Sequence, residues 1–321
     1  MDAASDDVVA WLLAGDPAVR WQVMRDLLDA PAAAVDAERA RVVHEGWGAQ
    51  LMAARDPDGG WARAAFWPEG FTPDDWEREG QPWTATFPVL RLLADLGADP
   101  RDPALAATLD RVESSVRWEE GGQPFFAGEV EPCINGRVVS LTVWAGRDAR
   151  LIVERLLGEQ LPDGGWNCEV ERGATVSSFD TTINVLEGLA DYAAATGRST
   201  ALDQAMRAGE EYLLSRSLFR RLSTGEVVDE VYLDLSYPPQ WHYDILRALD
   251  HLRAAGRDPA PRAAQAVDVV RSKRRPDGRW PLERVHRGRT HLDIEEPGEP
   301  SRLITLRALR VLRWWERAPR S

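Results

Sequence analysis

The chain has 321 residues, of which 44% are hydrophobic, and a net charge of −13 at pH 7. This hydrophobic content suffices for a core, whereas the acidic balance argues against a nucleic-acid partner, because binding phosphates requires a basic surface. No apolar run resembles a signal peptide or a transmembrane segment, so we expect a cytoplasmic protein. With only two cysteines, Cys133 and Cys168, a disulfide framework is not indicated.

Helical periodicity recurs along the whole chain, whereas the alternation typical of strands is scarce. The helical segments form six pairs: 6–14 with 17–29, 36–54 with 82–97, 103–117 with 133–146, 147–160 with 178–196, 200–216 with 239–255, and 262–273 with 299–316. The first member of most pairs carries charged faces, and the second is more apolar. Because a helix that is apolar over most of its circumference is buried, we expect the second members to lie inside.

Three copies of a Pro-Asp-Gly turn followed by tryptophan punctuate these pairs, at 56–61, 161–166 and 275–280. They are spaced by 105 and 114 residues, which is close to two units of about 50 residues. In such a turn proline presets φ, aspartate bonds the backbone ahead, and glycine supplies a positive φ. The tryptophan adds a large apolar plate with one N–H donor. The spacing predicts an internally repeated helical array.

Six outer and six inner helices predict an all-α fold, specifically a closed α6/α6 toroid that spans residues 1–321 as a single domain. An open solenoid is the alternative. The long connections all run from an outer to an inner helix and would therefore meet at one rim: 56–81, 118–132, 161–177, 217–238 and 275–298. Connections of this length are often functional.

The stretch Gly-Glu-Gln-Leu-Pro-Asp-Gly-Gly-Trp at 158–166 is similar to the QW motif of the squalene cyclase and prenyltransferase β-subunit repeat superfamily, with Gln160 and Trp166 at the defining positions. The other two turns lack the glutamine. Together with the six helix pairs, the turns make nearly the whole chain resemble this superfamily. A single barrel is more similar to a prenyltransferase β-subunit, or to small bacterial squalene-cyclase-like proteins, than to the two-barrel cyclases.

The resemblance implies an enzyme that acts on a hydrophobic, isoprenoid-type small molecule in the central cavity. A non-catalytic toroid that binds a ligand or a protein is the alternative. Class II cyclases protonate an alkene with the middle aspartate of a D-x-D-D motif, and the matching stretch 178–182 places Asp180 at that position. Ser178 and Thr181 stand where the family has flanking carboxylates. The alternative role for Asp180 is a helix N-cap.

Four metal-ligating side chains would meet at the same rim if the toroid forms: Cys133, Cys168, Asp180 and His242. Two thiolates, a carboxylate and an imidazole suit zinc. Protein prenyltransferases hold catalytic zinc at this rim with aspartate, cysteine and histidine, so by analogy we expect zinc here. The alternative is that both cysteines are small core residues.

The inner helices also carry polar residues, which are costly to bury unless they are paired. Helical spacing puts Asp180, Asn184 and Glu187 on one stripe, and Arg137 lies on the preceding inner helix. These groups form either an internal network or the wall of a wet pocket. Our candidate catalytic residues are Asp180, Glu187 and Arg137, and our candidate substrate contacts are Trp83, Asn184, Trp241, Tyr243 and Arg302.

Overall fold

The computed structural model describes residues 5–317. The α-helices of this part are α1 (Asp6–Leu13), α2 (Pro17–Asp26), α3 (Ala32–Arg39), α4 (Gly46–Ala53), α5 (Pro73–Glu79), α6 (Thr86–Leu96), α7 (Pro103–Ser115), α8 (Pro132–Trp144), α9 (Arg150–Gly158), α10 (Phe179–Thr196), α11 (Thr200–Ser215), α12 (Ile245–Ala254), α13 (Ala264–Ser272) and α14 (Arg302–Glu316). Two short strands, β1 (Trp280–Pro281) and β2 (Pro300–Ser301), pair antiparallel. Helices dominate, so the predicted all-α class is confirmed.

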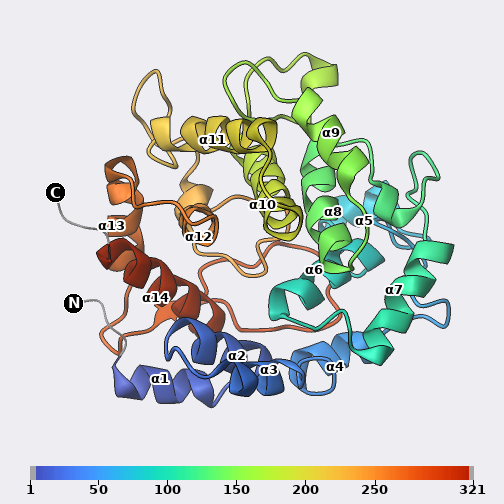
Figure 1. The fold of residues 1–321 in the computed structure, drawn as a ribbon, viewed down its shortest axis with the longest axis horizontal. Helices are drawn as coiled ribbons and strands as arrows, with labels where there is room; N and C mark the ends of the chain where they lie inside the picture. Colours follow the sequence, from blue (N-terminus) through green and yellow to red (C-terminus); the bar gives the residue numbers. More distant parts are fainter. Residues whose placement is uncertain (1–4, 318–321) are drawn as a thin grey trace.

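The helices lie in two layers around a common centre (Figure 1). Helices α2, α6, α8, α10, α12 and α14 face the centre, and α1, α4, α7, α9, α11 and α13 lie outside them. The two ends of the helical array meet where α14 packs against α2. There the Arg310 side chain donates hydrogen bonds to Gln22 at 3.1 Å and to Asp26 at 3.4 Å.

The second predicted pair differs from the structure. The expected helix 36–54 is two helices, α3 and α4, because the chain turns at Gly46, whose φ is +59°. A Cβ at this position would lie 1.8 Å from a carboxylate oxygen of Asp16, so only glycine fits. The same carboxylate accepts the amide of Trp47 at 2.8 Å and so caps α4. Helix α5, inside the first rim connection, is also additional, and the regular toroid of six plus six helices therefore stays a prediction.

The three tandem turns form the same pair of hydrogen bonds. The indole N–H of Trp166 donates to the carbonyl of Leu156 at 2.7 Å, and its backbone N–H donates to Oγ1 of Thr182 at 3.1 Å. The other two copies repeat this pattern with Trp61, Leu51 and Thr86, and with Trp280, Val270 and Thr305. All three tryptophans are fully buried. Each turn thus ties an outer helix to the inner helix that follows it.

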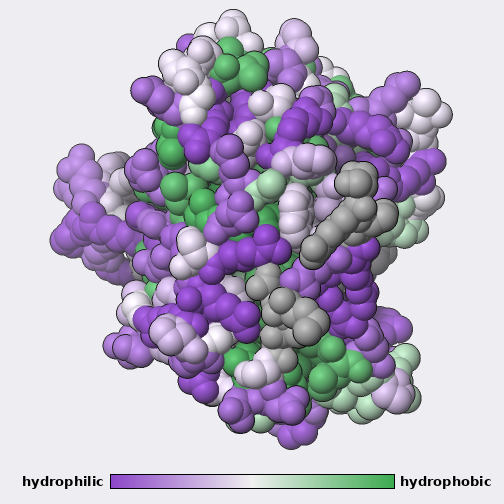
Figure 2. Space-filling model, turned by 90° about the vertical axis from the view of Figure 1, so that its left-hand side faces the viewer, coloured by the Kyte–Doolittle hydropathy of each residue, from purple (hydrophilic) through white to green (hydrophobic). Residues whose placement is uncertain are grey.

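The surface agrees with the charged outer faces expected from the sequence. On the side that carries α13 and α14, hydrophilic residues predominate and hydrophobic ones form small separate areas (Figure 2). None of the helices between residues 5 and 317 combines the length and the apolar character needed to cross a membrane.

Candidate functional site

A cavity of about 620 Å³ opens at the rim where α8 and α10 begin, and we call it the rim pocket. The rim connections close over it and contribute most of its aromatic lining: Phe66, Trp67, Trp76, Phe87, Trp118 and Trp241. Its volume lies within the range of about 300–1,000 Å³ typical of small-molecule sites. An aromatic pocket therefore lies at the rim where the sequence predicts that the long connections meet.

Asp180 lines this pocket from the first turn of α10. Its Oδ1 accepts the backbone N–H of Tyr243 at 2.7 Å, and its Oδ2 accepts the hydroxyl of Tyr232 at 2.9 Å. The cap of α10 is Ser178, whose side chain accepts the amide of Thr181. The alternative N-cap role for Asp180 is therefore wrong, and its carboxyl group is oriented by two tyrosines instead.

Burial raises the pKa of Asp180, although the hydrogen bonds from Tyr243 and Tyr232 and the charge of Arg247 lower it. The net effect is a raised pKa, because desolvation penalises the ionised carboxylate more than these partners favour it. A carboxyl group that holds its proton more firmly than usual, next to an aromatic pocket, can act as a general acid.

A cluster of metal-ligating groups lies in the same pocket. Ligand atoms of Glu131, Cys133 and Cys168 all lie within 4.8 Å of one another. The Cys133 thiol is 3.4 Å from Oε2 of Glu131, and the Cys168 thiol is 3.3 Å from Oγ1 of Thr181. The neighbouring Cys168 thiol, together with burial, raises the pKa of Cys133, and the proximity of Cys133 lowers the pKa of Cys168. The structure thus brings both predicted cysteines together.

The other two predicted ligands, Asp180 and His242, do not belong to this cluster, whose third member is Glu131. Asp180 is engaged by its two tyrosines. His242 lies before α12, where its ring stacks between Trp241 and His286 at centroid distances of 3.7 and 3.6 Å. Burial and the neighbouring His286 lower the pKa of His242 to about 3, so its ring is neutral at pH 7. The structure therefore brings two of the four predicted ligands together, and the predicted zinc site stays a prediction.

A buried ion network forms below the rim pocket. Glu187 accepts Nε and Nη2 of Arg247 at 2.8 and 2.7 Å, and Nη1 of Arg137 at 3.1 Å. The two arginine side chains are 1% and 4% exposed. Burial, together with the charges of Arg91 and Arg247, lowers the pKa of Arg137 to about 9, which leaves it protonated at pH 7. Of the predicted catalytic residues, Arg137 reaches the rim pocket and Glu187 does not.

Two predicted substrate contacts have structural roles. Asn184 is fully buried, and its side chain donates to the carbonyl groups of Asp180 and Trp241, at 2.7 Å in each case. Its Oδ1 accepts Nη2 of Arg247, also at 2.7 Å. Tyr243 is likewise buried, and its hydroxyl donates to the carbonyl of Leu218 at 2.6 Å. Both residues hold the elements around Asp180 in place.

Trp83 and Arg302 lie away from the rim pocket. Trp83 borders a separate cavity of about 610 Å³ beside the last rim connection. The guanidinium of Arg302 packs over the ring of Trp11 in α1, 4.6 Å from its centroid. Trp241, by contrast, does line the rim pocket, and its indole N–H donates to Oε1 of Gln81 at 2.7 Å. Of the five predicted contacts, only Trp241 faces this pocket.

Three residues of the site were not among our sequence candidates. Glu131 precedes Cys133 by two positions at the start of α8, a proximity visible in the sequence. Arg247 follows the cap of α12, Asp244, by three residues and so lies in its first turn. Tyr232 lies in a rim connection, where no periodicity indicates the direction of a side chain.

No family model matches the sequence, and no curated protein matches it either. Among solved structures, a protein from Actinoplanes is 17% identical with a TM-score of 0.44, over 94% of this chain and 90% of that chain. A variant of the type II terpene cyclase MstE from Scytonema, in complex with its substrate geranylgeranyl dihydroxybenzoate, is 16% identical with a TM-score of 0.40, over 95% and 86% of the two chains. Another MstE variant, in the apo form, is 15% identical with a TM-score of 0.35, over 86% and 95%. Likenesses of this size say nothing about activity.

Proposed function

We propose that this protein is an enzyme that acts on a hydrophobic, isoprenoid-type small molecule bound in the rim pocket, with Asp180 as its general acid. The observation that supports this most directly is a carboxyl group with a raised pKa beside a pocket walled by aromatic rings. A titratable group with a perturbed pKa in a cleft is a common property of active sites. The binding site is the rim pocket rather than the centre of the ring.

In the proposed reaction, the Asp180 carboxyl transfers its proton to one carbon of a substrate double bond. A new C–H bond forms, and a cation develops on the neighbouring carbon. The hydrogen bonds from Tyr232 and Tyr243 then stabilise the carboxylate that remains. The ring faces of Trp241 and its aromatic neighbours stabilise the cation. Attack by a second double bond closes a ring, and a carbon adjacent to the final cation then loses a proton. Water carries this proton away and Asp180 takes up a proton from solvent, so that the reaction is an isomerisation without net change of atoms.

A second part of the proposal concerns zinc, which we propose is held by Glu131, Cys133 and Cys168. The donor set fits, because two sulfurs and one carboxylate oxygen within 4.8 Å of one another are ligands that zinc accepts. Three protein ligands leave a fourth position, as in catalytic sites. When bound there, zinc would act as a Lewis acid towards a polar group of the substrate. The chain's own contribution is to bring together one sulfur from the first turn of α8 and one from the connection between α9 and α10.

The test uses purified protein incubated with geranylgeraniol and with squalene, followed by mass spectrometry of the products. We expect a cyclic isomer that gains one deuterium in heavy water, and a decrease of about 10²–10⁴-fold for Asp180→Asn. Asp191→Asn is the matched control, because Asp191 also lies on α10 but lines a different cavity, between the inner helices, and this change should leave activity unchanged. Saturable binding of these probes without any product, equal in wild type and Asp180→Asn, would instead favour the non-catalytic alternative.

A further inference from the structure

A third cavity, of about 370 Å³, lies between the helices that face the common centre, and we call it the central cavity. All six inner helices contribute to its lining, from Gln22 of α2 to Arg310 of α14. Arg137 borders both this cavity and the rim pocket. The Arg137–Glu187–Arg247 network therefore separates an aromatic compartment from a polar one.

The central cavity has an excess of positive charge. Seven arginines but only four carboxylates line it, within a protein whose net charge is −13. Burying guanidinium groups without matching anions is unfavourable, because desolvation costs several kcal/mol per ion. The local sign of charge is thus opposite to that of the whole protein, which indicates a site for an anion.

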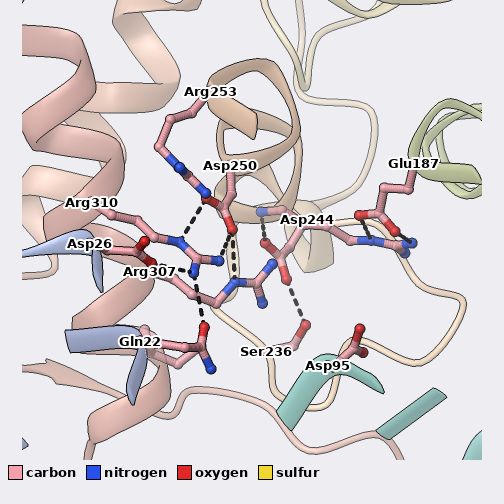
Figure 3. Close-up of polar contacts among 12 residues, drawn as sticks. Gln22, Asp26, Asp95, Glu187, Ser236, Asp244, Asp250, Arg253, Arg307 and Arg310 are labelled. Atoms are coloured by element: carbon pink, nitrogen blue, oxygen red, sulfur yellow. Dashed lines mark hydrogen bonds and ion pairs between the residues drawn. The ribbon is translucent and has the colours of Figure 1, made fainter. Parts of the chain in front are cut away.

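One carboxylate serves three arginines in this cavity (Figure 3). Asp250 accepts Nε of Arg253 at 2.8 Å and Nε of Arg310 at 2.9 Å. Arg307 also points towards Asp250, but its Nε is 3.6 Å away, beyond hydrogen-bond distance. Asp26 also pairs with Arg310, at 3.4 Å, so two carboxylates face the three guanidinium groups of Arg253, Arg307 and Arg310. Arg307 therefore retains donor capacity on the cavity side.

Arg91 provides a second, independent sign of a missing acceptor. This residue of α6 is 9% exposed and lines the cavity. Its Nη2 donates to Oδ1 of Asp95 at 2.7 Å, but its Nε is buried and has no hydrogen-bond partner among the described residues. Leaving a buried donor unpaired costs about 1–3 kcal/mol, and more for a charged group. A small shift of this side chain towards an anion in the cavity would supply the acceptor.

We propose that the central cavity binds a phosphate group, with Arg91 and Arg307 as its principal donors. Phosphate offers several acceptor oxygens and about two negative charges, and the planar guanidinium fork matches it with paired hydrogen bonds. The two arginines approach the cavity from different helices, α6 and α14. This site is distinct from the rim pocket, and the proposal does not depend on the activity proposed for Asp180.

The test is isothermal titration calorimetry at constant ionic strength, with inorganic phosphate and with glycerol 3-phosphate as probes and with chloride and malonate as comparisons. We expect saturable binding of one equivalent of phosphate, weakened at least tenfold in Arg307→Gln. Arg172→Gln removes the same charge from an arginine whose side chain is 80% exposed, and it should bind like wild type. Asp180→Asn should also bind like wild type, which separates this test from that of the proposed enzyme.

The two phosphate probes identify the source of the group. Tighter binding of glycerol 3-phosphate assigns the cavity to an organic phosphate ester, and tighter binding of inorganic phosphate assigns it to the free ion. Arg91→Gln provides a second variant if Arg307→Gln fails to fold, as judged by circular dichroism. Binding no tighter than that of chloride, malonate binding as tight as phosphate, or equal affinities in the folded arginine variants would overturn the proposal.

Discussion

The hydroxyl of Tyr232 donates a 2.9 Å hydrogen bond to Oδ2 of Asp180 across 52 positions of sequence. Burial, and then the charge of Asp180, raise the pKa of the tyrosine, so it remains a donor over the working pH range. The bond favours the ionised form of Asp180, whereas burial favours the protonated form. Tyr232 therefore adjusts the acidity of the proposed catalytic group without taking part in the reaction.

The first prediction concerns the pH dependence of the proposed activity. A general acid works while it is protonated, so activity should be retained below the pKa of Asp180 and lost as the pH rises through it. Tyr232→Phe removes a hydrogen bond that lowers this pKa, and the basic limb should therefore move to higher pH. A pH–rate profile of kcat/KM measures the shift. Tyr192→Phe, in the C-terminal half of α10, is the control. If the basic limb of the pH–rate profile stays in place in Tyr232→Phe, this role for Tyr232 is contradicted.

The second prediction is that about one equivalent of zinc copurifies with tag-free protein and is lost in Cys133→Ser and Cys168→Ser. Because Glu131 completes the cluster, Glu131→Gln should weaken metal retention, whereas His242→Ala should not. Elemental analysis measures both effects. Zinc lost in His242→Ala but kept in Glu131→Gln would restore the ligand set expected from the sequence, and a folded, metal-free wild type would leave the cysteines as packing residues.

The third prediction concerns stability. Burial alone would raise the pKa of Glu187, but Arg247 and Arg137 lower it by more. A lowered pKa stabilises the fold at pH values above the usual value of 4.5, and this contribution is lost as the pH falls below it. Glu187→Gln should cost about 3–5 kcal/mol at pH 7, because two buried guanidinium groups lose their shared partner.

Urea unfolding at pH 7 and at pH 3.5 measures this effect, and the penalty of Glu187→Gln should shrink at the lower pH. Glu113→Gln removes a carboxylate whose side chain is 50% exposed and is paired with Arg147, so its effect should stay below about 1 kcal/mol. Equal penalties for the two variants would show that the network does not stabilise the fold.

The fourth prediction tests the tandem turns. Trp166→Phe leaves the buried carbonyl of Leu156 without its donor, and Thr182→Val leaves the amide of Trp166 without its acceptor. Each change should lower the free energy of unfolding by about 1–3 kcal/mol. Trp76→Phe is the matched control, because Trp76 is 40% exposed, and it should change the value by about 0.5 kcal/mol or less. If Trp166→Phe is as mild as the control, the indole bond has no structural importance.

Most helices were predictable because their signals are local. The turn and tryptophan of 161–166, for example, find their partners within ten and sixteen residues. Which residues form the site depends on directions set by distant segments. His242 was expected at the start of an inner helix, but α12 begins at Ile245, and the loop position lets His242 stack on His286 instead.

The inner polar stripe was predicted as either an internal network or the wall of a wet pocket. Glu187 joins the ion network and also borders the central cavity. Helical spacing alone could not decide between these alternatives, because the deciding partner, Arg247, comes from another helix 60 positions away. The same limitation explains why Arg302, on a well-predicted helix, faces Trp11 rather than a pocket.

The contact between α14 and α2 has a consequence for folding. The tryptophan turns form over short stretches of chain, whereas Arg310 reaches Gln22 across 288 positions. Closing so long a loop is entropically costly, so we expect this seam to form late and to open first. Because α2 and α14 both line the central cavity, the lining of this cavity is complete only once the two helices are in contact. A ligand bound in this cavity would stabilise the contact between α2 and α14 and would therefore slow amide hydrogen exchange in these two helices.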